Sequence, residues 1–276
     1  MPIKPKLGQN FLHDQPAIQR IVAALGDCSQ QTVVEIGPGR GAVTHALAAR
    51  AAHVLAIELD DTMVPLLRAE FPADRVTVVH QDVLQFDFAA AAQQAGHPLA
   101  IVGNLPYYIT SPILHKLAAS HTALGQPVLD RAVLMMQREV ADRVAAQPGS
   151  RDYGLLSVTV QLYGSVEILF TLPPAAFSPP PKVHSSVIRW RFAPRFSSLG
   201  IDDEASFQSF LRSVFAQKRK TLANNLRAAG FLPSDLAPSF ASAGIDPLVR
   251  AEALSIESLA ALWKSLKDAA RSSPQD

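Results

Sequence analysis

Residues 32–41 read Thr-Val-Val-Glu-Ile-Gly-Pro-Gly-Arg-Gly, and this stretch decides the fold of the first part of the chain. The run Thr32–Ile36 is rich in β-branched residues, which is typical of a buried strand. The glycines that follow predict a tight turn, and the apolar pattern of Val43–Ala51 predicts a helix. A strand, a glycine-rich turn and a helix in this order place backbone N–H groups beside a bound ligand. The stretch therefore predicts a cofactor site at the end of a buried strand.

The glycine-rich turn alone does not identify the cofactor. Gly37, Gly39 and Ala42 also satisfy the dinucleotide pattern G-x-G-x-x-G/A. Glu58 follows about 20 residues further on, near the spacing of an acid that binds a ribose. Three alternatives remain open at this point: a nicotinamide cofactor, a methyl donor, and a tight turn that binds nothing.

Strand-like and helix-like segments alternate along the first part of the chain. Asp14 and Pro16 predict the start of a first helix. The apolar runs that predict strands of a parallel sheet are Thr32–Ile36, His53–Glu58, Arg75–His80, Leu99–Val102 and Arg131–Met136. Val166–Phe170 and Ser185–Phe192 follow each other without a long helix between them and predict an antiparallel pair. We therefore expect an α/β sheet covered by helices on both faces.

The pattern changes after Phe192. Ala193–Ala205 contains Pro, Ser and Asp residues and predicts a connector. Only helical patterns follow, and Thr221–Ala229 stops at Gly230, which is typical of a helix end. The sequence therefore predicts a domain 1–195 that contains the sheet, followed by a small all-helical domain 201–271.

Polar residues stand at the ends of successive predicted strands. Glu58 ends the second strand, Asp82 follows the third, and Asn104 ends the fourth. In open α/β sheets, ligands bind in the crevice at the carboxyl ends of the strands. Glu58 can accept from both hydroxyls of a ribose, and Asp82 can accept from the amine of a cofactor adenine. This series favours a methyl donor over a nicotinamide.

The segment Asn104-Leu105-Pro106-Tyr107 carries the groups needed to hold the amine of a second adenine, the methyl acceptor. The side-chain carbonyl of Asn104 and the backbone carbonyl of Leu105 could accept its two N–H groups. Pro106 stiffens the backbone, and Tyr107 offers a stacking face. A nitrogen held in this way becomes more tetrahedral and directs its lone pair at a methyl carbon. We expect no catalytic histidine, since the methylated nitrogen is acidic and loses its proton readily.

With these motifs in their order and spacing, the chain resembles the ribosomal RNA adenine dimethyltransferases, specifically the bacterial small-subunit branch. The resemblance spans nearly the whole chain. The residues that carry it, besides residues 35–41 and 104–107, are Gly8–Leu12, Ile57–Asp60, Gln81-Asp82, Phe177–Val183 and Gln217–Thr221. It implies a Rossmann-like class I methyltransferase sheet followed by a small helical domain that recognises RNA, matching the division predicted above.

The resemblance also implies the reaction. The donor would be S-adenosylmethionine, and the acceptors would be two adjacent adenosines in the 3′-terminal hairpin of small-subunit rRNA, each methylated twice in a late step of ribosome biogenesis. The cofactor contacts that it implies fall on Asn10, Leu12, Gly37, Gly39, Glu58, Asp82 and Asn104. Tyr108 departs from the family, whose members often carry Asn after the Asn-Leu-Pro-Tyr motif.

Contacts to RNA are expected at aromatic and basic residues. A target base must leave its stack to reach such a pocket, and Tyr107 and Phe177 are the candidates to sandwich it. For Phe177 the alternative is ordinary core packing beside the prolines that follow it. The basic residues expected to contact phosphates are Lys182, Lys218, Arg219, Lys220 and Arg227.

Composition limits the remaining possibilities. The net charge is only +1, so RNA binding must depend on local patches. Cys28 is the single cysteine, which excludes an intrachain disulfide, and we expect no metal site. No apolar stretch approaches the roughly 18 residues of a membrane span. We expect a cytoplasmic monomer. Two alternatives stay open: a large-subunit rRNA adenine methyltransferase, and a ribosome-assembly factor without catalytic activity.

Overall fold

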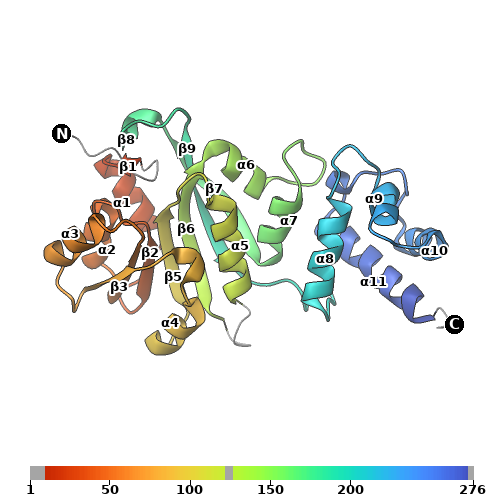
Figure 1. Cartoon of the computed structure of the whole chain (residues 1–276), viewed down its shortest axis with the longest axis horizontal. Coiled ribbons are helices and arrows are strands. Elements are labelled where there is room, and N and C mark those ends of the chain that lie inside the picture. Colours follow the sequence, from red (N-terminus) through yellow and green to blue (C-terminus); the bar gives the residue numbers. More distant parts are fainter. Residues whose placement is uncertain (1–9, 122–126, 273–276) are drawn as a thin grey trace. The chain divides into compact units, whose positions relative to one another are not determined.

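The computed structural model describes residues 10–121 and 127–272, which form two compact units (Figure 1). Gly8 and Gln9 of the first family motif lie outside the described residues. Unit 1 comprises Met1–Asp142 and Gly164–Phe192, and unit 2 comprises Arg143–Tyr163 and Ala193–Asp276. In their described residues, unit 1 combines sheet and helices, whereas unit 2 is built from helices alone.

The main sheet of unit 1 has seven strands in the order β4-β3-β2-β5-β6-β9-β7. Their bounds are Thr32–Ile36 (β2), His53–Glu58 (β3), Val76–His80 (β4), Leu99–Asn104 (β5), Leu129–Gln137 (β6), Gly164–Leu172 (β7) and Ser185–Phe192 (β9). Strands β2 to β6 run parallel to one another, and β9 is antiparallel to both β6 and β7. The predicted parallel sheet and its late antiparallel pair are therefore confirmed.

Helices cover both faces of this sheet, as Figure 1 shows for α1 and α5 on opposite sides of it. The helices of unit 1 are α1 (Gln15–Ala24), α2 (Ala42–Ala48), α3 (Met63–Glu70), α4 (Phe88–Ala95), α5 (Thr110–His121) and the start of α6 (Arg138–Ala145), with short 3₁₀ turns at Val83–Gln85 (η1) and Pro174–Ala176 (η2). Helix α1 begins as predicted, since the Asp14 side chain accepts from Ala17 N at 3.0 Å. Its buried residues Ile18 and Val22 join the core with residues of α2 and α3.

A second, two-stranded sheet was not predicted. Phe11–Leu12 (β1) pairs antiparallel with Phe177–Ser178 (β8), and Leu12 lies opposite Phe177. Strands of two residues have no measurable side-chain periodicity, so the sequence pattern could not show them. This pairing joins the segment after the N-terminus to the segment before the prolines.

Gly103 allows two neighbouring strands to approach closely just before the strand ends. A Cβ atom at this position would lie 2.9 Å from the backbone oxygen of Ile36 on β2 and 3.0 Å from the Cβ atom of Ile36. Backbone atoms in a paired strand cannot move aside without disturbing the sheet. Gly103 thereby sets the spacing between the ends of β2 and β5.

We therefore expect Gly103→Ala to destabilise the protein by about 1–3 kcal/mol, the usual cost of overpacking. Urea unfolding would show a lower midpoint with an unchanged slope. Gly154→Ala is the matched control, because Gly154 is extended (φ −177°) and its Cβ atom would meet nothing within 4 Å. Equal midpoints for the two variants would contradict the proposed close approach.

Unit 2 contains the remaining helices. They are the end of α6, then α7 (Leu155–Leu162), α8 (Glu204–Val214), α9 (Leu222–Ala228), α10 (Pro233–Ala243) and α11 (Ile256–Ser272), with a 3₁₀ turn at Ala251–Ala253 (η3). Thr221 caps α9 by accepting from Asn224 N at 3.3 Å, which agrees with the predicted helix. The buried side chains Phe207 and Trp263 meet edge to face at a centroid distance of 5.5 Å, which ties α8 to α11.

Unit 2 also takes in a segment that the sequence pattern assigns to the first domain. Arg143–Tyr163 belongs to it because of contacts far along the chain. The Tyr163 hydroxyl accepts from Gln208 Nε2 at 2.7 Å, and Gly149 N donates to Glu252 O at 2.7 Å. The division into a methyltransferase domain 1–195 and an RNA-recognition domain 201–271 stays a prediction about function.

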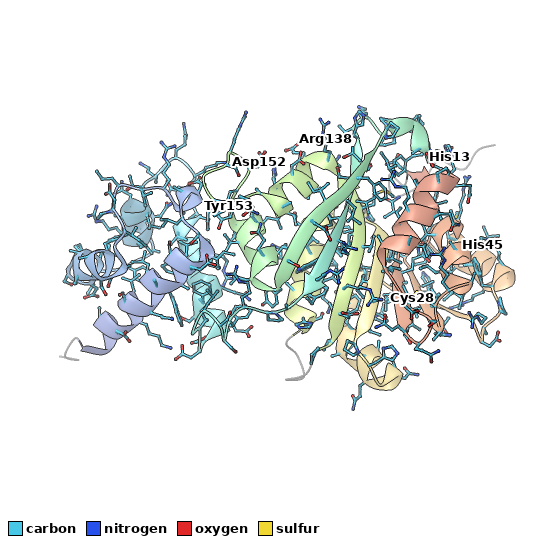
Figure 2. The ribbon with its side chains drawn as sticks, turned by 180° about the vertical axis from the view of Figure 1, so that it is seen from behind. His13, Cys28, His45, Arg138, Asp152 and Tyr153 are labelled. Atoms are coloured by element: carbon cyan, nitrogen blue, oxygen red, sulfur yellow. The ribbon has the colours of Figure 1, made fainter. Side chains whose placement is uncertain are left out.

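Three further findings concern the described residues as a whole. None of their helices combines the length and the apolarity needed to cross a membrane. They contain no group of three or more His, Cys, Asp or Glu side chains that could hold a metal ion. Cys28, labelled in Figure 2, is a buried free thiol whose pKa is raised because burial disfavours the thiolate.

Candidate active site

A cavity in unit 1 lies where β2, β3 and β5 end. The turn after β2 and the last residues of β3 and β5 form much of its wall. Parallel strands present their carboxyl ends at the same edge of a sheet, which is why residues far apart in sequence meet here. The predicted residues that line the cavity are Asn10, Leu12, Gly37, Gly39, Glu58, Asp82, Asn104, Leu105, Pro106 and Tyr107.

The glycine-rich turn depends on a backbone conformation that other residues rarely adopt. Gly37 and Gly39 have φ angles of +68° and +57°, in the left-handed region. Gly39 also needs to lack a side chain, since a Cβ atom would lie 2.9 Å from two ring carbons of Phe11. The Phe11 ring also forms a cation–π contact with Arg40, whose guanidinium carbon lies 4.6 Å from the ring centroid. The segment around β1 therefore packs directly on the turn.

Glu58 is held at the end of β3 by backbone N–H groups. Its Oε2 atom accepts from Gly39 N at 3.0 Å, and its Oε1 atom accepts from Leu59 N and Asp60 N, each at 2.8 Å. A carboxylate offers about four lone-pair sites, so the side chain retains little free capacity. Oε1 already accepts two bonds, so a ribose that bonds to both oxygens would have to displace Leu59 N or Asp60 N. The binding of both ribose hydroxyls by Glu58 remains a prediction.

Asp82 lies at the next strand end, after β4. Its Oδ1 atom accepts from Leu84 N at 2.9 Å and caps the short turn η1. This bond fixes the orientation of the carboxylate at the cavity wall. The side chain is therefore placed where the sequence predicts an acceptor for the adenine of the cofactor, and that role stays a prediction.

Glu35 was missed as a functional candidate, although it stands in the motif quoted first. It is 3% exposed, lines the cavity and accepts from Thr44 Oγ1 at 2.6 Å. Burial raises its pKa to about 7, the Thr44 bond partly offsets this, and the neighbouring charge of Glu58 raises it further. The available signal was an acid inside an apolar strand, two residues before the first glycine of the turn.

We expect Glu35→Gln to change how stability depends on pH. The folded protein binds this proton more tightly than the unfolded chain, so the stabilisation is complete below the ordinary pKa of 4.5 and is lost as the pH rises to about 7. This difference in pKa corresponds to roughly 3 kcal/mol. Glutamine stays neutral, so the free energy of unfolding of the variant, relative to that of the wild type, should rise by about 2–3 kcal/mol between pH 5 and pH 8. Urea unfolding at pH 5 and pH 8 without cofactor measures this difference. If the free energy of unfolding depended on pH in the same way for both proteins, the raised pKa assigned to Glu35 would be wrong.

Asn104 ends β5 with its side-chain amide oriented by a hydrogen bond. Its Nδ2 atom donates to the backbone oxygen of Asn10 at 2.9 Å. The donor end of the amide is thereby engaged, and the acceptor end, Oδ1, is the group left for a ligand in the cavity. Leu105 N donates to Met135 O at 2.9 Å, which holds the next residue on β6. The two predicted acceptors of the adenine amine therefore sit on a rigid strand end.

The hydroxyl of Tyr107 forms a hydrogen bond within the protein. The hydroxyl is 2.8 Å from Ser185 Oγ on β9, and burial raises its pKa. The phenol therefore remains protonated near neutral pH and cannot serve as a base. The ring is half-buried and lines the cavity, as a stacking face requires.

Phe177 does not lie where the stacking prediction requires. It is 2% exposed, belongs to the hydrophobic core of unit 1, and is not among the described residues that line the cavity. Its pairing with Leu12 in the β1–β8 sheet explains this position. The alternative interpretation, core packing, describes the observed conformation, and stacking by Phe177 would require β1 to separate from β8.

The predicted RNA-binding residues are all exposed. Lys182 is in unit 1, whereas the others are in unit 2 at the loop between α8 and α9 and at the end of α9: Lys218, Arg219, Lys220 and Arg227. Lys218 Nζ donates to Arg151 O at 2.7 Å, and Arg227 donates to Asn224 Oδ1 at 3.2 Å. The acceptors in both bonds are neutral oxygens, so Lys218 and Arg227 keep their positive charge for contacts with phosphates.

Comparison with known proteins identifies the family. The sequence signature described as Ribosomal RNA adenine dimethylase matches residues 2–268. A protein of Acidobacterium capsulatum named Ribosomal RNA small subunit methyltransferase A is 57% identical over 266 residues, covering 96% of this chain and 92% of that protein. Its namesake from Koribacter versatilis is 46% identical over 276 residues, covering 96% and 94%.

Solved structures show the same fold. The 23S rRNA methyltransferase ErmE superposes with a TM-score of 0.69 at 25% identity, covering 94% of this chain and all of that one. A dimethyladenosine transferase from Plasmodium falciparum superposes with a TM-score of 0.74 at 23% identity, covering 94% and 98%. The Rossmann-like methyltransferase fold expected from the sequence is therefore confirmed.

The residues present fit S-adenosylmethionine. Gly37 and Gly39 add no side chain to the cavity wall after β2, and the carboxylates of Glu58 and Asp82 lie at that wall, where a ribose hydroxyl and an amine would donate to them. Bound there, the cofactor supplies a methyl group on a positively charged sulfur, which suits a cavity lined by Glu35, Glu58 and Asp82. From the family match and this site, the chain belongs to the ribosomal RNA adenine dimethylase family and is an S-adenosylmethionine-dependent methyltransferase.

Proposed function

We propose that this enzyme dimethylates the exocyclic amines of two adjacent adenosines in the 3′-terminal hairpin of small-subunit rRNA. It acts as a cytoplasmic monomer on an assembly intermediate of the subunit, late in ribosome biogenesis. The observation that carries the chemistry is the bond from Asn104 Nδ2 to Asn10 O, which leaves the Oδ1 acceptor for an adenine amine. The names of the relatives from A. capsulatum and K. versatilis support the choice of the small subunit.

The chain activates the amine by holding it. The lone pair of an adenine amine is delocalised into the ring, so the nitrogen is a poor nucleophile. When Asn104 Oδ1 and the Leu105 carbonyl accept its two N–H groups, the nitrogen becomes more tetrahedral and its lone pair faces the methyl carbon. Positioning of this kind contributes about 7–11 kcal/mol in favourable cases.

The proton leaves without a strong base. The methylated nitrogen carries a positive charge and is acidic, so water can take its proton. The described residues that line the cavity include no histidine, and the Tyr107 hydroxyl is bound to Ser185. After the first transfer the amine retains one N–H group, so one of the two acceptors is sufficient for the second transfer.

Two alternatives are less well supported. A large-subunit enzyme shares the catalytic motif, but the segment Gln217–Thr221 resembles the small-subunit branch, and the relatives above carry the small-subunit name. An assembly factor without catalysis does not need an oriented amide at Asn104 or a buried glycine turn. Binding to immature subunits and methylation can occur in the same protein.

The reaction can be tested with tritiated S-adenosylmethionine and small ribosomal subunits that lack the modification. We expect labelled dimethyladenosine from small subunits, and none from large subunits or duplex DNA. Asn104→Ala should lower the rate at least 100-fold because it removes the amide acceptor, yet it should leave RNA affinity within about twofold. Label in large-subunit RNA would assign the other branch, and binding without label would favour the assembly factor.

The basic loop of unit 2 is held in place by a buried side chain. Asn225 is 3% exposed, and its Nδ2 atom donates to Val214 O at 2.8 Å and to Gln217 O at 3.2 Å. These bonds join the end of α8 to the start of the loop. The start of the loop that carries Lys218–Lys220 is therefore fixed by hydrogen bonds, and we propose that these residues contact RNA phosphates.

Replacing the three cations Lys218, Arg219 and Lys220 by alanine should weaken RNA binding and its dependence on salt. Each phosphate contact contributes about 0.7–0.9 to the slope of log affinity against log salt, so we expect the slope to fall by about 2. Filter binding between 50 and 200 mM salt measures this. Arg212→Ala, which removes an exposed cation on α8, is the control. An unchanged slope in the triple variant would remove the loop from the RNA interface.

A further inference from the structure

Tyr108 is an exposed aromatic residue at the rim of the cavity. It is 60% exposed, lines the cavity next to Asn104 and Tyr107, and comes just before α5. Single exposed apolar side chains are common on protein surfaces, so exposure alone has no meaning here. The position of this ring, beside the acceptors of the adenine amine, is the informative feature.

The other aromatic residues of the lining already have partners. Phe11 packs on the glycine turn, with the Arg40 guanidinium 4.6 Å from its ring centroid. Tyr107 is tied to Ser185 through its hydroxyl. Within the described part of the chain, no hydrogen bond or ring contact involves Tyr108. Among the lining residues, Tyr108 thus offers the aromatic face with the most free surface.

We propose that Tyr108 stacks on the base of the nucleotide that flanks the adenosine being methylated. This inference rests on the function proposed above. When one adenosine leaves its stack to enter the cavity, its neighbour loses a stacking partner, and an aromatic ring at the rim can replace that partner. In a substrate with two adjacent adenosines the flanking base is itself an acceptor, so Tyr108 positions the second adenosine while the first one reacts.

In this proposal Tyr108 is a positioning residue, because its exposed ring contacts the flanking base and not the reacting atoms. A positioning role predicts an effect on RNA binding and on the completion of the second modification. It predicts no effect on the affinity for S-adenosylmethionine, since the ring lies at the exposed rim of the cavity and away from the strand ends of the cofactor motif.

The test compares the full-length wild type with Tyr108→Ala and Tyr108→Phe on unmodified small subunits. Loss of one stacked base corresponds to about 5- to 150-fold in affinity, so we expect Tyr108→Ala to raise KM for subunits at least fivefold. We expect kcat to change less than twofold, the Kd for S-adenosylmethionine to stay the same, and subunits modified at only one adenosine to accumulate. Tyr108→Phe retains the ring and should behave as the wild type.

Leu66→Ala is the matched control, because Leu66 is 61% exposed on α3 and does not line the cavity. The inference fails if Tyr108→Ala leaves KM unchanged, if Tyr108→Phe is as impaired as Tyr108→Ala, or if the cofactor Kd weakens instead. Failure of the proposed function has a different signature, since the wild type itself would then leave small subunits unlabelled. If the wild type labels small subunits and the Tyr108 variants match it in KM and in products, only the role of Tyr108 is overturned.

Discussion

The hydrogen bond from the Asn104 amide to the Asn10 carbonyl is the contact on which the site depends. A side-chain amide has a donor end and an acceptor end, and engaging the donor end leaves only one orientation for the acceptor. The bond also joins the segment before β1 to the end of β5. The orientation of the acceptor and the position of Asn10 at the cavity wall are therefore coupled, and a change in either of them would alter the other.

The cavity also concentrates negative charge below the glycine turn. Glu35 is buried, and burial together with the nearby charge of Glu58 raises the pKa of the Glu35 carboxyl to about 7. Without a cation, a carboxyl with this pKa holds its proton below about pH 7 and ionises as the pH rises through that value. A positively charged sulfonium group is a suitable counter-charge in such a place, whereas the neutral thioether left after transfer is not. The acidic lining beside the glycine turn thus agrees with the charge of the methyl donor.

Much of the sheet could be predicted from the sequence because its strands are buried on both faces. Thr32–Ile36, His53–Glu58 and Ser185–Phe192 have the predicted bounds, since apolar runs end where polar turn residues begin. Strand β7 extends beyond its apolar pattern at both ends, because Gly164, Ser165, Thr171 and Leu172 also pair with β9, and its register shifts after Ile168. The cavity residues were predictable because parallel strand ends converge. Their individual bonds to the substrate stay predictions.

The features that escaped prediction depend on contacts between distant segments. The burial of Phe177 results from a two-residue pairing with Leu12 that leaves no pattern in either segment. The raised pKa of Glu35 results mainly from its burial, and the hydrogen bond from Thr44 of α2 at 2.6 Å partly offsets that effect. The assignment of Arg143–Tyr163 to unit 2 results from Gln208 and Glu252, which lie far along the chain.

The buried state of Cys28 has a practical consequence for spectroscopy. The only thiol of the chain is 2% exposed, and its raised pKa keeps it in the unreactive protonated form. A cysteine introduced at an exposed position such as Leu248, which is 75% exposed in unit 2, would then react with a maleimide dye alone. The native cysteine therefore does not have to be removed before a new cysteine is labelled. The fluorescence of a dye on that one residue can then follow the binding and release of ribosomal subunits.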